Sequence, residues 1–571
     1  MMILKGIPAS GGIAAGPAYI FRHSEVGIRR ETISDPTAEI ARLNAARDAA
    51  RQQLQTLREK TEAEASAEEA AIFDAHAMFL DDPSLLEMVA DVVNREKLNV
   101  EAAWSDGIEN FAAQMEMMGD EYLSARAADI RDVGKRVIRI LSGQGETDLS
   151  GLSAPSIILA QDLTPSDTAR LDKQFVLGFA TAEGGPTSHT AILAKALGLP
   201  AVVGCGPRLS EIASGTDMLI HGAKGELVAN PDEATRKQYE KLTGEASRLA
   251  EQELKSAGEH AVTKDGRQVE IVANVGSPSD AVSALKFGAE GIGLLRTEFL
   301  YLERSTAPTE EEQLTAYKAV LDVMETRPVV VRTLDVGGDK QLDYLDLGKE
   351  ANPFLGWRAI RMCLDKPEFF KIQLRALLRA SPGHDLRIMF PMIATLEEVR
   401  RSKALLAEAR QEVLAGGSPV ADHIQVGIMV EIPAAAQMAD LFAKEVDFFS
   451  IGTNDLTQYT MAAERTSEKM AYLADPCHPA VVRQIKRVIE EGHKAGIWIG
   501  VCGEMAGDPE AAPVLLGLGL DEFSMAAPGI PHLKAILREW TYAEAKKLAE
   551  HVVNFENGAA VREYVRNYLH E

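Results

Sequence analysis

The sequence has little of what marks membrane, secreted and nucleic-acid-binding proteins. Its 571 residues contain no run of about eighteen apolar residues that could span a bilayer. Cysteine is scarce, and because no two of the four share C-x-x-C spacing, neither a disulfide framework nor a zinc ribbon is indicated. The formal net charge of −25 leaves no excess of basic residues to attract nucleic acid or anionic lipid. We therefore expect reduced thiols, no nucleic-acid partner and no membrane insertion.

The N-terminal segment does not show the pattern of a secretory signal. Residues 1–21 are interrupted by Pro8, Gly11, Gly12 and Pro17, so they form no unbroken apolar core. We expect a cytoplasmic protein. Its length predicts two to four domains, and its acidity means that an anionic substrate must be held by local arginines.

Between residues 36 and 141 the pattern is helical. Apolar side chains recur three or four positions apart, which is the period of a helix with one buried face. Short connections such as Asp82-Pro83 indicate a bundle of helical hairpins. The longest stripe consists of Trp104, Ile108, Phe111, Met115, Met118 and Tyr122.

Short apolar runs separated by glycine turns flank this helical region on both sides. They predict one α/β domain, residues 1–30 and 145–230, into which a helical bundle, residues 31–144, is inserted. Residues 231–260 are polar and charged, and we interpret them as a helical linker.

Residues 261–571 alternate strand-like apolar runs with helical stretches. Eight such β/α units predict a (β/α)₈, or TIM, barrel. The predicted strands are residues 269–273, 291–295, 329–331, 388–390, 426–430, 448–451, 498–501 and 522–524.

Unusual polar residues follow the C-terminal ends of these strands. A barrel of this kind builds its active site at that end, so the distribution marks one mouth as the candidate site. The residues concerned are Asn274, Arg296, Arg332, Glu431, Asn454, Asp455, Cys502 and Ser524.

A second group of candidate residues lies in the α/β region, in residues 184–195 (GGPTSHTAILAK). Its glycines allow close approach of a ligand, and the predicted helix start after His189 offers amides that favour a phosphate. A histidine there can accept a phosphoryl group on a ring nitrogen. A lone histidine is more often structural, but the whole string favours function.

This string resembles the phosphohistidine signature of phosphoenolpyruvate-using enzymes. The resemblance to one family, Enzyme I of the bacterial phosphoenolpyruvate-dependent sugar phosphotransferase system, extends over nearly the entire chain. The other matching segments are residues 129–132 (DIRD), 163–166 (LTPS), 294–299 (LLRTEF), 332–340 (RTLDVGGDK), 352–358 (NPFLGWR), 452–459 (GTNDLTQY) and 501–507 (VCGEMAG).

The resemblance implies a phosphohistidine swivelling domain with an inserted carrier-binding bundle, followed by a phosphoenolpyruvate-binding TIM barrel that forms a homodimer. It implies transfer of the phosphoryl group of phosphoenolpyruvate to His189, with release of pyruvate, and then to the phosphocarrier protein HPr. Glu431 and Asp455 match the family's Mg²⁺ ligands, Cys502 its proton donor and Thr168 a hydroxyl that hydrogen-bonds the histidine. The substrate-binding positions are matched by Arg296, Arg332, Arg358, Asn454, Asp455 and Arg465.

Some positions depart from the family pattern: Pro186 where a basic residue is common, Lys195 for arginine, Glu464 for aspartate and Thr466 for glycine. Pro186 removes a charge beside the histidine, which leaves the transfer rate and the acceptor preference open. None of the four replaces a proposed ligand.

Other readings of the sequence remain. A phosphoenolpyruvate synthase or pyruvate phosphate dikinase shares the histidine motif but needs an ATP-binding domain, and no G-x-x-x-x-G-K-[ST] loop occurs. A paralogue that serves a nitrogen-regulatory or dihydroxyacetone-kinase relay is a second alternative. A catalytically silent sensor of phosphoenolpyruvate is a third, although retention of His189, Glu431, Asp455 and Cys502 argues against it. A structural scaffold is the least favoured.

Overall fold

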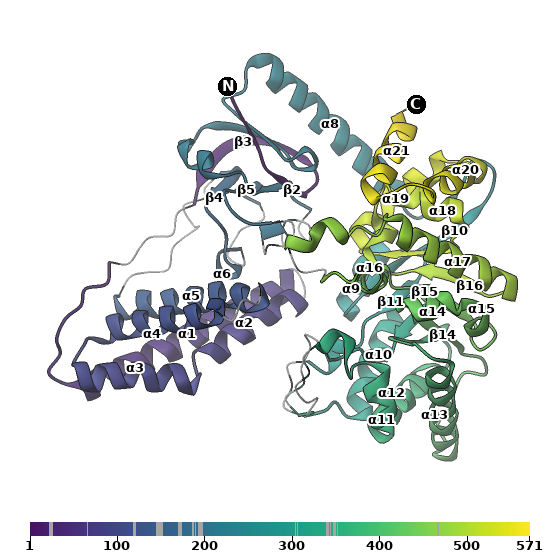
Figure 1. Cartoon of the computed structure of the whole chain (residues 1–571), viewed down its shortest axis with the longest axis horizontal. Coiled ribbons are helices and arrows are strands. Elements are labelled where there is room, and N and C mark those ends of the chain that lie inside the picture. Colours follow the sequence, from purple (N-terminus) through teal and green to yellow (C-terminus); the bar gives the residue numbers. More distant parts are fainter. Residues whose placement is uncertain are drawn as a thin grey trace. The chain divides into compact units, whose positions relative to one another are not determined.

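The computed structural model divides the chain into two compact units, Met1–Ser247 and Arg248–Glu571. Helix α8 (Glu233–Lys255) occupies the predicted linker and runs from one unit into the other (Figure 1). The structure describes the chain except for residues 22–26, 65–66, 118–120, 144–151, 153, 169–173, 186–187, 189, 192–193, 195–197, 303, 305, 338–341, 343, 346–349, 351, 465–467 and 571.

The first unit contains a mixed sheet in the order β1-β8-β7-β3-β4-β5-β6-β2. Strands β3, β4, β5 and β6 are parallel, and the remaining pairs are antiparallel. The strands are β1 (Met2–Lys5), β2 (Ile7–Ser10), β3 (Ile13–Ile20), β4 (Ser156–Ala160), β5 (Val176–Thr181), β6 (Ala201–Val203), β7 (Asp217–His221) and β8 (Glu226–Ala229). The short helices beside it are α6 (Pro165–Thr168), η2 (Pro207–Glu211) and η3 (Gly222–Lys224). Sheet strands therefore come from both sides of the helical region, as the sequence predicts for an inserted bundle.

The described residues between β3 and β4 form five helices, of which α1, α4 and α5 pack side by side (Figure 1). Trp104 is fully buried, and its indole N–H donates to the Gly134 carbonyl at 3.1 Å. A Cβ at Gly134 would lie 2.6 Å from the Ile108 side chain, so glycine lets α4 and α5 approach closely. The helices are α1 (Pro36–Glu64), α2 (Ala67–Phe79), α3 (Pro83–Glu96), α4 (Val100–Met117) and α5 (Glu121–Leu141).

The second unit contains a closed parallel barrel, which confirms the predicted fold class. Strands β10 to β17 pair in sequence order, and β17 also pairs with β10 to close the ring. A short strand that the sequence did not predict, β9 (Ala261–Val262), pairs antiparallel with β10. The barrel strands are β10 (Gln268–Val275), β11 (Ile292–Leu295), β12 (Val329–Arg332), β13 (Leu386–Phe390), β14 (Gln425–Val430), β15 (Phe448–Ile451), β16 (Trp498–Val501) and β17 (Glu522–Met525).

Helices follow the strands, and of those that the structure describes, three begin with a complete capping box. Thr309, Thr395 and Thr541 each accept from the backbone N–H three residues on, where a glutamate bonds back to the threonine backbone. The α-helices are α9 (Pro278–Lys286), α10 (Glu310–Met324), α11 (Ile360–Asp365), α12 (Pro367–Ala380), α13 (Leu396–Ala415), α14 (Pro433–Gln437), α15 (Ala439–Phe442), α16 (Thr453–Met461), α17 (Pro479–Ala495), α18 (Ala512–Leu518), α19 (Ile530–Glu539), α20 (Tyr542–Val552) and α21 (Gly558–His570). The 3₁₀ turns are η4 (Glu298–Leu300), η5 (Pro353–Leu355), η6 (Glu468–Leu473), η7 (Glu504–Gly507) and η8 (Ala527–Gly529).

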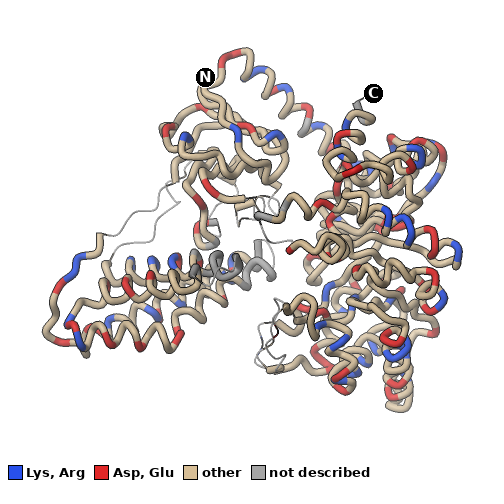
Figure 2. Tube along the Cα trace, viewed as in Figure 1, with Lys and Arg blue, Asp and Glu red and all other residues tan. Residues whose placement is uncertain are grey.

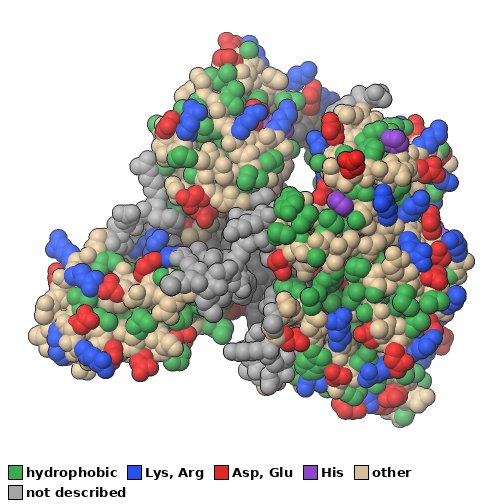
Figure 3. Space-filling view, in the orientation of Figure 1, with side chains coloured by type: hydrophobic (Ala, Val, Ile, Leu, Met, Phe, Trp, Pro, Cys, Tyr) green, Lys and Arg blue, Asp and Glu red, His purple; other side chains and the backbone are tan. Residues whose placement is uncertain are grey.

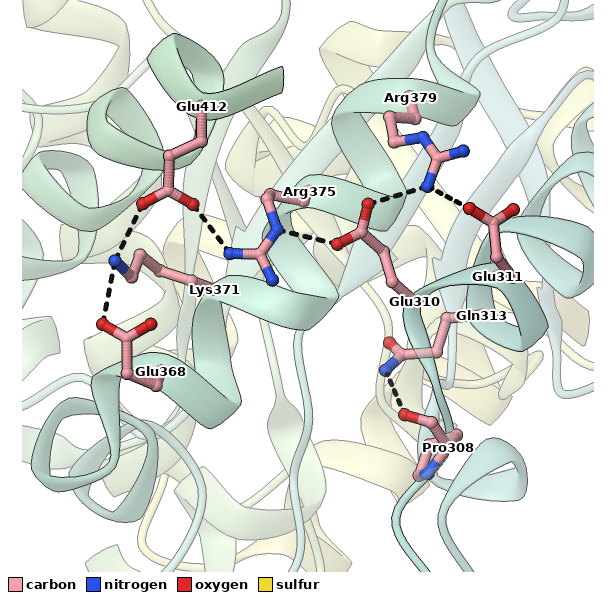
Figure 4. Close-up of polar contacts among 9 residues, drawn as sticks. All are labelled: Pro308, Glu310, Glu311, Gln313, Glu368, Lys371, Arg375, Arg379 and Glu412. Carbon is pink, nitrogen blue, oxygen red and sulfur yellow. Dashed lines mark hydrogen bonds and ion pairs between the residues drawn. The ribbon is translucent and has the colours of Figure 1, made fainter. Parts of the chain in front are cut away.

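A ladder of ion pairs joins α10, α12 and α13 on the outside of the barrel (Figure 4). Arg375 of α12 lies 2.7 Å from both Glu310 of α10 and Glu412 of α13. Arg379 extends the ladder to Glu311 at 2.6 Å, and Lys371 contacts Glu412 at 2.9 Å. These charged side chains fix neighbouring helices whose inner faces pack on the barrel.

The C-terminal end of α8 is attached to the barrel by a buried lysine. Lys534 of α19 is fully buried, and its ammonium donates to the carbonyls of Ala257, Glu259 and Gly288 at 2.8–3.1 Å. The backbone that leaves α8 is thereby held within the second unit.

Charge is distributed rather than segregated. Acidic and basic side chains are intermixed along the helices of the second unit (Figures 2 and 3). Among the described helices, none combines the length and the hydropathy needed to cross a bilayer.

The barrel interior contains a buried carboxylate. Glu522 lies opposite Gly500 in the β16–β17 ladder, and a Cβ at Gly500 would meet the Glu522 Oε1 atom at 2.6 Å. Glu522 is 1% exposed, and neither carboxylate oxygen has a hydrogen-bond partner among the described residues. Burial, with a contribution from Glu270, raises the pKa of Glu522 to about 8.

We predict that Glu522→Gln stabilises the protein at alkaline pH. Because the folded pKa lies above the unfolded value, the stability linked to this proton is present at low pH and is lost as pH rises towards 8. The variant should therefore gain on the order of 3 kcal/mol relative to wild type at pH 9 and little at pH 5. Urea unfolding at the two pH values measures this, with exposed Glu539→Gln as control. An equal difference at both pH values would contradict the prediction.

Candidate active site

The mouth of the barrel brings together most of the polar residues predicted to end its strands. Arg332 ends β12, Glu431 follows β14 directly, and Cys502 follows β16. Arg296 follows β11 and is exposed. Asn454 and Asp455 lie in the first turn of α16, immediately after β15.

Two buried arginines share a carboxylate at this mouth. Arg332 places one terminal nitrogen 2.5 Å from Glu298 Oε1 and the other 3.0 Å from Asp335 Oδ2. The second oxygen of Asp335 accepts from Arg358 at 2.8 Å. Burial alone would lower the pKa of Arg332, but the charges of Glu298 and Asp335 outweigh it and raise that pKa, so the guanidinium stays charged.

Some N–H groups of these arginines remain available. Among the described residues, Arg332 Nε and Arg358 Nε and Nη1 have no hydrogen-bond partner, although both side chains are at most 8% exposed. Buried charged donors of this kind are costly unless they are paired. A bound anion with several oxygens, such as a phosphate or a carboxylate, would satisfy them.

Glu431 is the most deeply buried acid of the mouth. Its Oε1 accepts from the Met392 backbone N–H at 2.6 Å, whereas Oε2 has no hydrogen-bond partner among the described residues. Gly452 leaves space beside it, since a Cβ there would lie 3.1 Å from Oε2. Burial, then the charges of Asp455 and Asp335, raise the pKa of Glu431 to about 8. A cation at Oε2 would relieve this cost.

The donor set fits Mg²⁺. In the described part of the chain, no group of three or more His, Cys, Asp or Glu residues could hold a metal by itself. Mg²⁺ does not need such a cage, because it usually binds through one or two carboxylates together with substrate oxygens and water. Glu431 and Asp455 provide that number of carboxylates.

Cys502 lies in the barrel interior, 5% exposed, beside Met429 and Leu294. Its backbone carbonyl accepts from Asn274 Nδ2 at 3.0 Å, and Ser524 donates to Asn274 Oδ1 at 2.6 Å. Burial raises the pKa of the thiol to about 11, against the opposing effect of Arg332. Cys502 is therefore a protonated thiol at neutral pH, and its backbone is held by Asn274 of β10, which Ser524 of β17 orients in turn.

Asn454 is oriented by the loop that follows Cys502. Its side-chain oxygen accepts from the Glu504 backbone N–H at 3.0 Å. A Cβ at Gly503 would lie only 2.0 Å from Thr453 Oγ1. Glycine therefore permits the close approach of the loops that follow β15 and β16.

Two predicted site residues lie outside the described residues: His189 of the first unit and Arg465 of the second. Thr168 is the last residue of α6, but its side chain is not described. The departures Pro186, Lys195 and Thr466 are likewise outside.

Two of the matching segments of the first unit do meet in the structure. Ser166 Oγ of α6 donates to Asp132 of α5 at 2.6 Å. This bond connects residues 163–166 of the α/β part with residues 129–132 of the bundle.

Sequence reasoning missed several residues of the mouth. Glu298 and Asp335 flank Arg332, yet neither received a role, although both lie within matching segments. Met392 and Gly452 shape the surroundings of Glu431 through backbone alone. The sequence does contain a signal for Glu298 and Asp335, because an arginine at the end of a buried strand needs a counter-charge. It contains no signal for the backbone contacts of Met392 and Gly452.

Comparison with known proteins covers almost the whole chain. Residues 250–542 match the PEP-binding domain of PEP-utilising enzymes, residues 5–126 their N-terminal domain and residues 152–225 their mobile domain. The phosphoenolpyruvate-protein phosphotransferase of Geobacillus stearothermophilus is 50% identical over 99% of this chain and 97% of that protein. That of Staphylococcus carnosus is 48% identical over 99% of both.

This chain belongs to the phosphoenolpyruvate-protein phosphotransferase family. The resemblance to Enzyme I that its motifs carried is thereby confirmed, and the chain is an enzyme of the PEP-utilising group. A solution structure of Enzyme I (nEIt) is 41% identical and covers 43% of this chain and 99% of its own, with a TM-score of 0.38, which supports no structural argument.

For this phosphotransferase, we predict that Asp335→Asn destabilises the barrel. Two buried guanidinium groups would lose the charge that they share, which costs about 3 kcal/mol. Urea unfolding measures the loss. The control is Glu445→Gln, which breaks an exposed pair with Arg400 and should change stability little. Equal effects of the two substitutions would contradict the prediction.

Proposed function

We propose that this chain is the general phosphotransferase of a sugar phosphotransferase system. It takes the phosphoryl group of phosphoenolpyruvate onto His189, releases pyruvate and passes the group to the phosphocarrier protein HPr. The names of the relatives support the reaction. The structural observation that carries it is the pair of buried arginines, Arg332 and Arg358, with unsatisfied donors at a mouth that also holds a carboxylate and a thiol.

The arginines bind and orient the substrate. Phosphoenolpyruvate carries a phosphate and a carboxylate, and planar guanidinium groups suit both. We assign this role to Arg296, Arg332, Arg358 and Arg465, with Asn454 as a further phosphate donor. Asp335 holds two of these guanidinium groups at a fixed separation before the substrate arrives.

Glu431 and Asp455 are the proposed Mg²⁺ ligands. When bound, Mg²⁺ neutralises charge on the phosphate oxygens and favours departure of the enolate. The unpartnered Glu431 Oε2 supports this assignment independently of family membership.

The transfer itself needs a nucleophile and an acid. A ring nitrogen of His189 attacks phosphorus, and the bond between phosphorus and the enol oxygen breaks to leave the enolate of pyruvate. Cys502 then donates its thiol proton to the methylene carbon, and the thiolate recovers a proton from solvent. The raised pKa of Cys502 supports this role, because an acid must hold its proton until the enolate forms. Thr168 is proposed to hydrogen-bond His189.

The proposed division of labour follows the sequence boundaries. Residues 1–30 and 145–230 form the phosphohistidine domain, residues 31–144 dock the carrier, residues 231–260 link the halves, and residues 261–571 bind phosphoenolpyruvate and dimerise. The match of residues 152–225 to a mobile domain supports a histidine that serves two partners in turn. We further propose a cytoplasmic homodimer.

The decisive test is incubation of the purified protein with phosphoenolpyruvate and Mg²⁺, followed by intact mass. We expect the gain of one acid-labile phosphoryl group that His189→Ala lacks and that added HPr removes. Omitting Mg²⁺, or introducing Glu431→Gln, should abolish the gain. No modification in wild type would overturn the proposal and favour a silent sensor.

We predict a separate effect for Cys502→Ala. Loss of a positioned acid slows proton transfer by about a hundredfold or more, so pyruvate formation should fall by that factor while the affinity for phosphoenolpyruvate stays near wild type. Coupled reduction of pyruvate measures the rate. Cys363→Ala, at a buried thiol of α11, should leave the rate unchanged. An unchanged rate in Cys502→Ala would remove Cys502 from the mechanism.

A further inference from the structure

Gln373 of α12 is a buried residue whose side-chain amide bonds to three neighbouring segments of the second unit. It is 1% exposed. Its Nε2 donates to Thr297 Oγ1 at 3.2 Å and to the Tyr317 hydroxyl at 3.0 Å, while its Oε1 accepts from the Leu334 backbone N–H at 2.9 Å. Because the Leu334 amide can only donate, the orientation of the Gln373 amide is unambiguous.

These bonds close a ring around the end of β12. Thr297 Oγ1 donates to the Arg332 carbonyl at 3.0 Å, and Gln373 connects Thr297 with Leu334, two residues beyond Arg332. Thr297 directly precedes Glu298, and Leu334 directly precedes Asp335. The ring therefore holds the backbone at the base of both carboxylates that contact the Arg332 guanidinium.

A second set of bonds fixes the outer side of Gln373. Tyr317 and Tyr301 both donate to Gln313 Oε1, at 3.2 and 2.9 Å. Gln313 Nε2 donates to the Pro308 carbonyl at 3.2 Å (Figure 4). Tyr317, Tyr301 and Gln313 are each at most 1% exposed. The ring is thus backed by a buried, connected polar network that joins α12 to α10.

We infer that Gln373 is a positioning residue for substrate binding, acting through Glu298 and Asp335 on Arg332 and, through Asp335, on Arg358. This inference rests on the proposed function, because it assumes that these arginines hold phosphoenolpyruvate. Gln373 touches no substrate. Without its amide, the buried Leu334 N–H loses its acceptor and Thr297 its donor, so the two acids shift and the guanidinium groups with them.

A purely structural role would give a different result. Loss of a buried hydrogen bond that serves packing alone lowers stability without changing substrate affinity. A positioning role raises the KM for phosphoenolpyruvate and leaves kcat nearly unchanged, provided that the bound substrate still reaches the same transition state. A raised KM with an unchanged kcat therefore indicates a positioning role, whereas lower stability with an unchanged KM indicates a structural one.

The experiment uses the full-length protein with three substitutions. Gln373→Met conserves size and removes the amide; Thr297→Val removes the hydroxyl; Thr297→Ser keeps it. Tyr317→Phe is the matched control, because it removes the bonds of the Tyr317 hydroxyl to Gln373 and Gln313 while the bonds of Gln373 to Thr297 and Leu334 remain. We measure KM and kcat for pyruvate formation, and the binding of phosphoenolpyruvate in a His189→Ala background, where no transfer can follow.

We expect the KM and the dissociation constant to rise about tenfold in Gln373→Met and Thr297→Val. Thr297→Ser should restore values near wild type, and Tyr317→Phe should lower thermal stability without changing KM. Unchanged KM and affinity in a folded Gln373→Met would overturn the inference while wild-type activity upholds the proposed function. An inactive wild type would instead overturn the proposed function. If Gln373→Met does not fold, the Thr297 pair decides alone.

Discussion

The burial of positive charge at the barrel mouth is the constraint on which the site depends. Two guanidinium groups removed from water require compensating charge, and Asp335 supplies it to both at once. Glu298 completes the contacts of Arg332. Since these acids do not occupy every N–H group, the site stays able to bind an anion within a protein whose net charge is −25.

Burial at the mouth also sets the protonation of Glu431 and Cys502. Burial and neighbouring acids raise the pKa of Glu431, while burial keeps Cys502 a thiol despite the nearby Arg332. Cys502 already has the protonated state that its proposed role needs, whereas Glu431 would bind a cation as the carboxylate and lose its proton on binding. A carboxylate that is costly to leave unpaired favours a cation, and a protonated thiol can act as an acid.

Sequence periodicity predicted the barrel well, because strands buried on both faces read as continuous apolar runs bounded by turn residues. It did less well where a pattern continued past the end of an element. The stripe from Trp104 to Tyr122 was interpreted as continuous, but α4 ends at Met117 and α5 begins at Glu121, so Tyr122 belongs to the next helix. Strand β9 was missed because two residues carry no periodic signal.

The candidate site was predictable for residues that end strands in family motifs, such as Arg332, Glu431 and Cys502. Gln373 was not predictable, because it lies in the middle of an amphipathic helix and its partners come from two loops and another helix. Nothing in the local sequence of α12 distinguishes it from an ordinary polar residue on the surface of the barrel.

The sequence by itself determined the eight β/α units of the barrel, the family and the chemical types at the mouth, since these follow from local patterns and motifs. Only the tertiary structure decided how the charges are balanced: that Asp335 joins Arg332 to Arg358, that Met392 and Gly452 surround Glu431, and that Gln373 supports them. The physical reason is that pairing and burial depend on distances between segments far apart in the chain, which closure of the barrel sets.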